Sequence, residues 1–155
     1  MRSKIEERLK ELGIDLPEPE EPKFSYIPCT QTGNLVYVSG QVARAGGELI
    51  YTGKLGSELT IEQGQEAARQ TIINSLSVLK WYLGDLDRIA KVVKVLGFVN
   101  SAPGFAEQPY VINGASDLLV EVFGENGKHA RSAIGVSELP FHTPVETEII
   151  VEIRD

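Results

Sequence analysis

The feature that most limits the fold is an apolar stripe along residues 60–84. Apolar side chains recur there at steps of four and three, the period of one helix face, at Ala68, Ile72, Leu76, Leu79 and Leu83. Thr60, with Gln63 three residues later, predicts the start of this helix, and Gly84 predicts its end. A helix with one continuous apolar stripe must bury it against another layer, so the chain needs a partner element for this face.

Strand patterns supply that layer. Residues 91–100 are apolar on both sides, which predicts a central strand covered on both faces. Residues 145–153 alternate between a mainly aliphatic set and a mainly acidic set, as in a strand with one buried face. A turn with Gly33 and Asn34 is expected between the first two of the shorter strands. Those shorter runs predict strands at 26–30, 35–39, around 49–51 and at 131–136.

The order of these elements predicts an α+β fold. A second helix is expected over about 106–123, with Pro109 tolerated in its first turn. The result is a single domain, a mixed β-sheet with two long helices on one face. A short capped helix and an acidic, proline-rich connector come first, so we interpret residues 1–22 as an accessory arm and 23–155 as the domain.

Composition argues against several classes of function. The net charge is −7 and the 15 basic residues are scattered, so a phosphate-binding surface and a nucleic-acid partner are not expected. No run reaches the 18 apolar residues of a membrane helix, and the charged N-terminus lacks the features of a signal peptide. We therefore expect no membrane association and a cytoplasmic protein.

Motifs for metal or cofactor chemistry are missing from the sequence. Cys29 is the single cysteine and is interpreted as a packed side chain. His129 and His142 stand 13 residues apart, without the spacing of a metal pair, and are interpreted as surface residues. No phosphate loop, nucleophile elbow or cofactor fingerprint is present. We expect no metal and no cofactor, so any chemistry must use ordinary side chains and water.

Polar residues inside the strand-like runs are the candidates for a site. Ser39 ends an apolar strand, Arg131 opens another, and Glu146 lies near the start of the last. Each could simply be exposed. If the two C-terminal strands pair, Arg131 and Glu146 could face one pocket, where a guanidinium could hold a substrate carboxylate through two parallel hydrogen bonds. They could equally pair with each other, and the periodicity leaves these alternatives open.

Three blocks resemble the reactive-intermediate deaminase family, also called the YjgF or L-PSP endoribonuclease family. Residues 35–41 are similar to its "(V/I)-x-x-S-G-Q" strand, and His129-Ala-Arg-Ser-Ala with the later Leu139-Pro140 resembles its "P-A-R-S … L-P" signature. Residues 145–148 resemble the closing "(V/I)-E-(I/V)-E". The match covers roughly residues 24–153 in the family's order.

The resemblance implies a chorismate-mutase-like fold and a homotrimer whose sheets line a central β-barrel, with three clefts between subunits. Members hydrolyse reactive enamines and imines, such as 2-aminoacrylate, to 2-keto acids and ammonia without a cofactor. By resemblance, Arg131 would bind the carboxylate of a small metabolite, and Glu146 would position or activate the attacking water, a role worth about 10²–10⁴-fold in rate. The other substrate-binding positions of the family correspond to Tyr26, Ser39, Gly40, Asn113 and Ala133.

Departures from the family pattern keep other functions in view. Ala133 stands where the family has Cys, and Phe24-Ser25-Tyr26 replaces "G-P-Y". The long stretch 42–59, the insert 101–105 and the N-terminal arm resemble a side branch described as chorismate-mutase-like. The first hypothesis is an enamine and imine deaminase. The alternatives are a non-catalytic binding or regulatory protein for keto or amino acids, and an endoribonuclease or translation inhibitor, which the acidic balance opposes.

Overall fold

The computed structural model describes residues 3–19, 21 and 24–155. Its main sheet has five strands in the order β1-β2-β7-β5-β6. Their bounds are β1 Cys29–Thr32, β2 Leu35–Val42, β5 Ile89–Asn100, β6 Ala130–Val136 and β7 Val145–Ile153. β6 runs parallel to β5, and the other neighbours are antiparallel, so the sheet is mixed as predicted. A small hairpin of β3 (Arg44–Ala45) and β4 (Glu48–Leu49) stands apart from it.

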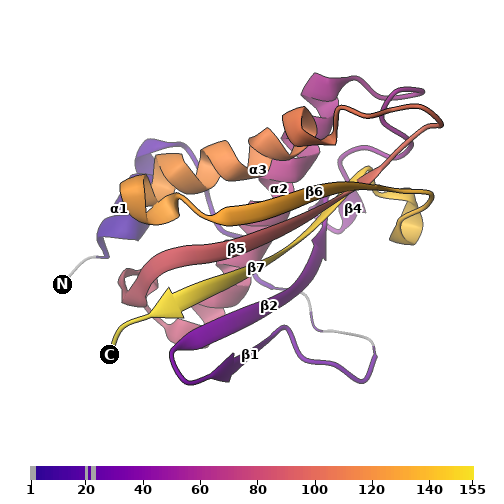
Figure 1. Ribbon diagram of the computed structural model, residues 1–155. Helices are drawn as coiled ribbons and strands as arrows, with labels where there is room; N and C mark the ends of the chain where they lie inside the picture. Colours follow the sequence, from indigo (N-terminus) through magenta and orange to yellow (C-terminus); the bar gives the residue numbers. More distant parts are fainter. Residues whose placement is uncertain (1–2, 20, 22–23) are drawn as a thin grey trace.

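Two long helices pack on one face of the sheet, as the sequence predicted. The helices are α1 Lys4–Glu11, α2 Ile61–Leu83 and α3 Gln108–Phe123, with short 3-10 turns η1 Leu86–Arg88, η2 Gly124–Gly127 and η3 Pro140–His142. The predicted capping box is present, since Thr60 and Gln63 satisfy each other's backbone N–H groups at the start of α2. Figure 1 shows α2 behind the sheet and α3 along its β6 side, with both termini toward the left of the view.

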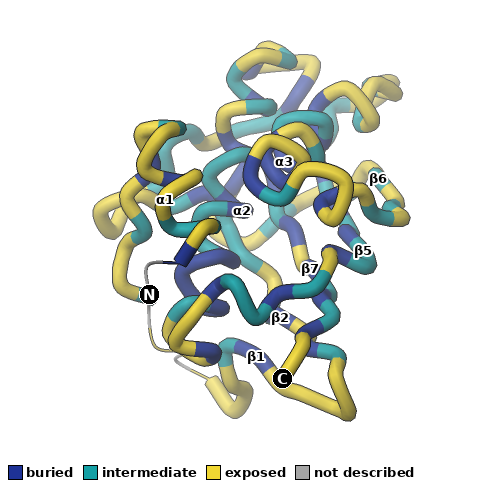
Figure 2. The backbone as a smooth tube through the Cα atoms, turned by 90° about the vertical axis from the view of Figure 1, so that its left-hand side faces the viewer, coloured by how far each residue is buried: buried dark blue, intermediate teal, exposed yellow. Residues whose placement is uncertain are grey.

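The core lies between these helices and the sheet, where Figure 2 shows the buried backbone. Ile72, Leu76 and Leu79 of α2 are fully buried, which confirms the predicted stripe. The two helices touch closely at Gly114 of α3, where a Cβ atom would lie 2.2 Å from the carbonyl oxygen of Gln65. Glycine at this point lets the helix backbones meet.

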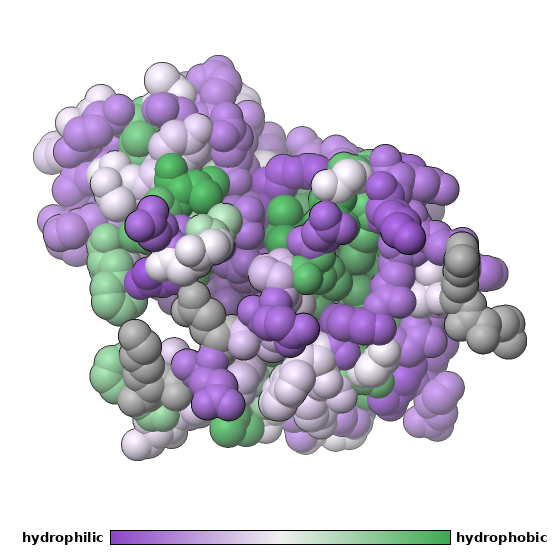
Figure 3. Space-filling model, turned by 180° about the vertical axis from the view of Figure 1, so that it is seen from behind, coloured by the Kyte–Doolittle hydropathy of each residue, from purple (hydrophilic) through white to green (hydrophobic). Residues whose placement is uncertain are grey.

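The N-terminal helix is joined to this core. Asp87 of η1 accepts hydrogen bonds from Ser3 Oγ at 2.9 Å and from the Ile5 amide at 2.9 Å. Leu9 is 2% exposed and Ile14 is 8% exposed, so both belong to the main apolar cluster. Figure 3 shows the molecule from behind the view of Figure 1. This face is mostly hydrophilic, with apolar side chains visible between polar ones.

The opposite face of the sheet carries apolar side chains that no described helix covers. Leu96 and Phe98 of β5 point there, and Tyr37 and Ile134 remain 40% and 42% exposed. The expectation that the strand at 91–100 is covered on both faces is therefore wrong for a single chain. Alternating apolar residues predict that a face is covered, but they do not say which molecule covers it.

One strand boundary differs from the expectation, because the first strand begins at Cys29 rather than Tyr26. The turn is the predicted pair Gly33-Asn34, with Gly33 at φ 57°. A glycine adopts that left-handed conformation without steric cost, which favours a tight two-residue connection. Within the described ranges, none of the helices combines the length and apolar character needed to cross a membrane.

Candidate functional site

Arg131 lies at the β6 edge of the sheet, on the side that faces the helices. Parallel pairing sets it opposite Val95 of β5, whose side chain is fully buried in the core. The guanidinium makes three hydrogen bonds to α3. Nη1 donates to Asn113 Oδ1 at 2.9 Å and to Ser116 Oγ at 3.1 Å, and Nη2 donates to the Pro109 carbonyl at 3.1 Å. The helix therefore fixes the orientation of this cation.

Two other predicted site residues lie beside it. Asn113 is its hydrogen-bond partner, and Ala133 lies two residues farther along β6, on the same face and opposite Gly97. We call Arg131, Asn113 and Ala133 the arginine half-site. Helical and strand periodicity place these three residues together, because α3 packs over β6.

Sequence reasoning missed two residues that complete this network. Ser116 Oγ lies 2.8 Å from His129 Nε2, and His129 Nδ1 lies 2.6 Å from the Gly127 carbonyl oxygen. His129 is half-buried and hydrogen-bonded, so interpreting it as a plain surface residue was wrong. Spacing could have revealed both, because Ser116 follows Asn113 by one helical turn and His129 precedes Arg131 by two residues.

Glu146 lies on the other face of the sheet. In β7 it sits between Phe98 of β5 and Val42 of β2, on the side away from the helices. Gly40 borders it closely, since a Cβ atom there would lie 2.5 Å from Glu146 Oε1. This glycine belongs to an irregularity in β2 between Val38 and Gln41, and such a bulge re-aims the chain locally.

Ser39 precedes that glycine and anchors the segment before β1. Its hydroxyl donates to the Ile27 carbonyl at 2.6 Å, and its amide donates to the Pro28 carbonyl at 2.8 Å. We call Ser39, Gly40 and Glu146 the glutamate half-site. The hydroxyl of Ser39 is thus engaged in holding the backbone in this chain.

The environment of Glu146 favours its protonated form. Burial raises the pKa of this carboxyl above its ordinary value, and the negative charge of Glu148 raises it further. A carboxylate with a raised pKa is a better proton acceptor when it is ionised, so Glu146 is suited to act as a general base.

The two half-sites do not share a pocket within one chain. β5 lies between β6 and β7, so the hypothesis that the two C-terminal strands pair is wrong. The alternative that Arg131 and Glu146 bind each other also fails, because the three hydrogen bonds of the guanidinium go to α3 and the two side chains point to opposite faces.

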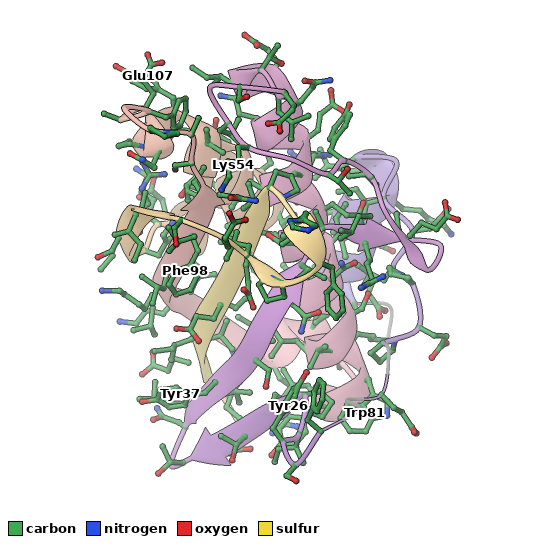
Figure 4. All side chains as sticks on the ribbon, turned by 90° about the vertical axis from the view of Figure 1, so that its right-hand side faces the viewer. Tyr26, Tyr37, Lys54, Trp81, Phe98 and Glu107 are labelled. Carbon is green, nitrogen blue, oxygen red and sulfur yellow. The ribbon has the colours of Figure 1, made fainter. Side chains whose placement is uncertain are left out.

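Tyr26 lies next to Ile27, whose carbonyl accepts a hydrogen bond from the hydroxyl of Ser39 in the glutamate half-site. It is 53% exposed and stacks against Phe24 at a centroid distance of 6.5 Å. Figure 4 shows it toward the same end of the view as Trp81, far from Lys54 at the other end. Cys29 is buried, as predicted, and burial raises the pKa of its thiol. Among the described residues, no group of three or more His, Cys, Asp or Glu side chains is placed to hold a metal ion.

Comparison with known proteins identifies the family. Residues 6–151 match the family described as "YjgF/chorismate_mutase-like, putative endoribonuclease". The chain belongs to this family. Protein TCP17 of Trypanosoma cruzi is 44% identical over 98% of this chain and 96% of that protein. A 2-iminobutanoate/2-iminopropanoate deaminase of Dermatophagoides farinae is 31% identical over 91% of this chain and 95% of its own length.

A solved structure shares this fold over nearly the whole chain. The crystal structure of Atu1372 from Agrobacterium tumefaciens, a protein of unknown function, superposes with a TM-score of 0.89 at 47% identity. The match covers 96% of this chain and 91% of that one. The YjgF-like fold predicted by resemblance is therefore confirmed, and the family includes at least one protein named as an imine deaminase.

Proposed function

We propose that this protein hydrolyses 2-imino acids and their enamine tautomers to 2-keto acids and ammonia. The observation that carries the proposal is the pair of half-sites. One presents an oriented guanidinium that suits a carboxylate, and the other presents a carboxyl of raised pKa next to a glycine. A relative that is 31% identical is named for this chemistry, which supports the same assignment here.

The proposal includes a homotrimer whose sheets surround a central barrel. Tyr37, Leu96, Phe98 and Ile134 leave an apolar sheet face without a covering element from the described part of the chain. Neighbouring copies packed on this face would bury it, and such packing is favourable by about 25 cal/mol per Å² of apolar surface. A neighbour would also bring its glutamate half-site toward the arginine half-site, forming a cleft at each boundary.

The reaction needs one anchor and one proton acceptor. Arg131 binds the substrate carboxylate with two hydrogen bonds and holds the imine carbon in place. Ionised Glu146 takes a proton from a water molecule as the water oxygen bonds to that carbon. Glu146 passes this proton to the imine nitrogen, which gives the carbinolamine. Its C–N bond then breaks as the hydroxyl proton moves to the leaving nitrogen, so that ammonia departs and the C=O bond of the keto acid forms. Side chains of the protein and water suffice for these reaction steps. The proposal also places the protein in the cytoplasm.

A second candidate is binding of small keto or amino acids without turnover. The observation that favours it is Ala133, which stands where the corresponding signature of the family has a cysteine. In that case Arg131 would contribute to affinity alone. The endoribonuclease activity in the family description is less suited to a chain of net charge −7, because phosphate binding depends on clustered basic residues.

A coupled assay tests the proposal. A dehydratase generates 2-aminoacrylate from serine, and pyruvate release is followed with wild type, Arg131→Ala and the control Arg69→Ala. Arg69 forms a surface ion pair with Glu121 at 3.6 Å on the outside of the helices. We expect wild type and the control to accelerate pyruvate release and Arg131→Ala to lose the effect. No acceleration by wild type would favour the binding protein, and a monomer in sedimentation would contradict the shared cleft.

A further inference from the structure

The hydrogen bonds of Arg131 leave one edge of its guanidinium free. A guanidinium carries five N–H groups, one on Nε and two on each Nη. Both Nη1 hydrogens are directed at Asn113 Oδ1 and Ser116 Oγ, and Nη2 directs one at the Pro109 carbonyl. No described residue accepts a hydrogen bond from Nε. The Nε hydrogen and one Nη2 hydrogen are therefore left without an acceptor among the described residues and can meet a carboxylate.

A chain of hydrogen bonds fixes the opposite edge. The Gly127 carbonyl can only accept, so the short contact to His129 requires a hydrogen on Nδ1. In the uncharged ring Nε2 then accepts the hydroxyl hydrogen of Ser116. The oxygen of Ser116 is left with its lone pairs toward Nη1 of Arg131. Gly127, His129 and Ser116 thus form one directed series that ends on the guanidinium.

His129 has a specific effect in this series. A serine inside a helix tends to turn its hydroxyl hydrogen back to the carbonyl four residues earlier, here Ile112. Ser116 instead donates to His129, which lies in the short connection before β6. Without the imidazole, the hydroxyl would be free to turn away, and Nη1 would lose an ordered acceptor.

We propose that Ser116 and His129 are positioning residues that hold Arg131 with its Nε–Nη2 edge presented to the carboxylate of a 2-keto or 2-imino acid. The ligand class rests on the proposed function, whereas the hydrogen-bond series rests on the distances alone. An arginine ordered before binding loses less side-chain freedom when the ligand arrives, so its affinity for a carboxylate is higher.

Two measurements test the proposal on the full-length protein. Nitrogen-15 NMR of the ligand-free protein reports the tautomer of His129, and we expect the hydrogen on Nδ1. Titration with 2-oxobutanoate, a stable keto acid, then reports the Arg131 Nε–H resonance and the dissociation constant. We expect that resonance to shift on binding. We expect Ser116→Ala and His129→Ala to weaken binding about three- to tenfold, the usual effect of losing one hydrogen bond.

Matched variants separate positioning from loss of folding. Ser116→Thr keeps the hydroxyl and should bind within about twofold of wild type. Ser77→Ala makes the same change on α2, where Ser77 is 3% exposed and back-bonded to the Ile73 carbonyl at 3.2 Å, and should leave binding unchanged. A hydrogen on Nε2 of His129, or unchanged affinity in Ser116→Ala, would overturn the proposal.

The outcome also distinguishes this inference from the proposed function. If wild type binds 2-oxobutanoate with the expected shifts but does not accelerate imine hydrolysis, the deaminase fails and the positioning role stands. If wild type shows no binding of 2-oxobutanoate, the assignment of the free edge to this ligand class is wrong, whatever the tautomer.

Discussion

The two half-sites are built on opposite faces of one sheet and by different means. Arg131 faces the helices and is held by three hydrogen bonds to α3. Glu146 faces away from the helices and is bordered by a bulged strand at Gly40. One is an oriented cation, and the other is a carboxyl whose pKa is raised by burial and by Glu148.

This difference separates binding from chemistry. A cation that must recognise a planar carboxylate benefits from a rigid helix that sets its edge. A carboxyl that must move a proton benefits from a partly buried setting that raises its pKa. Changes to the arginine half-site should therefore act mainly on KM, and changes to the glutamate half-site mainly on kcat.

The largest effect is expected from Glu146→Gln. The amide cannot accept a proton from water, so kcat should fall about 10²–10⁴-fold while KM changes little. Stability should not fall. Because the folded state raises the pKa of Glu146 above about 4.5, ionising it costs stability as pH rises through that value, and glutamine removes the cost.

The control for this variant is Glu152→Gln on the same strand and face. Glu152 lies at the far end of β7 and is 3.9 Å from Lys91. Activity is followed by pyruvate release and stability by thermal unfolding at pH 7. An equal loss of activity in both variants, or a large drop in melting temperature for Glu146→Gln, would argue against a proton-transfer role.

The next effect is expected from Arg131→Lys. Lysine keeps the positive charge but cannot make two parallel hydrogen bonds or satisfy Asn113 and Ser116 together, so kcat/KM should fall about 10- to 100-fold, chiefly through KM. Steady-state kinetics of both parameters checks this, with Arg69→Lys at a half-buried arginine outside the half-sites as the matched change. A loss confined to kcat would mean that Arg131 acts in the chemical step.

Sequence patterns predicted the helices and strands because local periodicity and capping determine them, whereas the family was predicted from the resemblance of three sequence blocks. The stripe from Ala68 to Leu83 and the Thr60 capping box both appear as expected. The faces of Arg131 and Glu146 could not be predicted in the same way, because they depend on which strands become neighbours. That order is a non-local property, and β5 inserts between β6 and β7 although it precedes both in sequence.

Two glycine substitutions compare the helix packing behind the arginine half-site with the strand bulge beside the glutamate half-site. Their expected effects on activity are smaller than those of the preceding variants. In Gly114→Ala the added Cβ meets the backbone of Gln65 at 2.2 Å, which cannot give way, so stability should fall by about 1–3 kcal/mol. In Gly40→Ala it meets the flexible end of Glu146 at 2.5 Å, so the carboxylate should move with little change in stability.

These variants are assessed by thermal unfolding and by activity measured well below the melting temperature. Gly40→Ala should lower kcat about tenfold, because the displaced Glu146 carboxylate is no longer aligned with the attacking water. Gly114→Ala should melt at a clearly lower temperature and keep more activity than Gly40→Ala. The reverse order would mean that the helices, and not the bulge, set the position of the carboxyl.

The smallest effect is expected from Glu148→Gln, which tests why the pKa of Glu146 is raised. Burial is the larger cause and remains, while the repulsion from Glu148 is removed. The pKa of Glu146 should therefore move down toward its ordinary value without reaching it. Because the ionised form is the active base, the acid limb of the pH profile of kcat/KM should shift to lower pH, with the same plateau rate.

The control is Glu152→Gln, which removes a charge farther along the same face and should leave the acid limb in place. An unmoved limb in Glu148→Gln would assign the raised pKa to burial alone, and a shift to higher pH would mean that Glu146 works as the protonated acid.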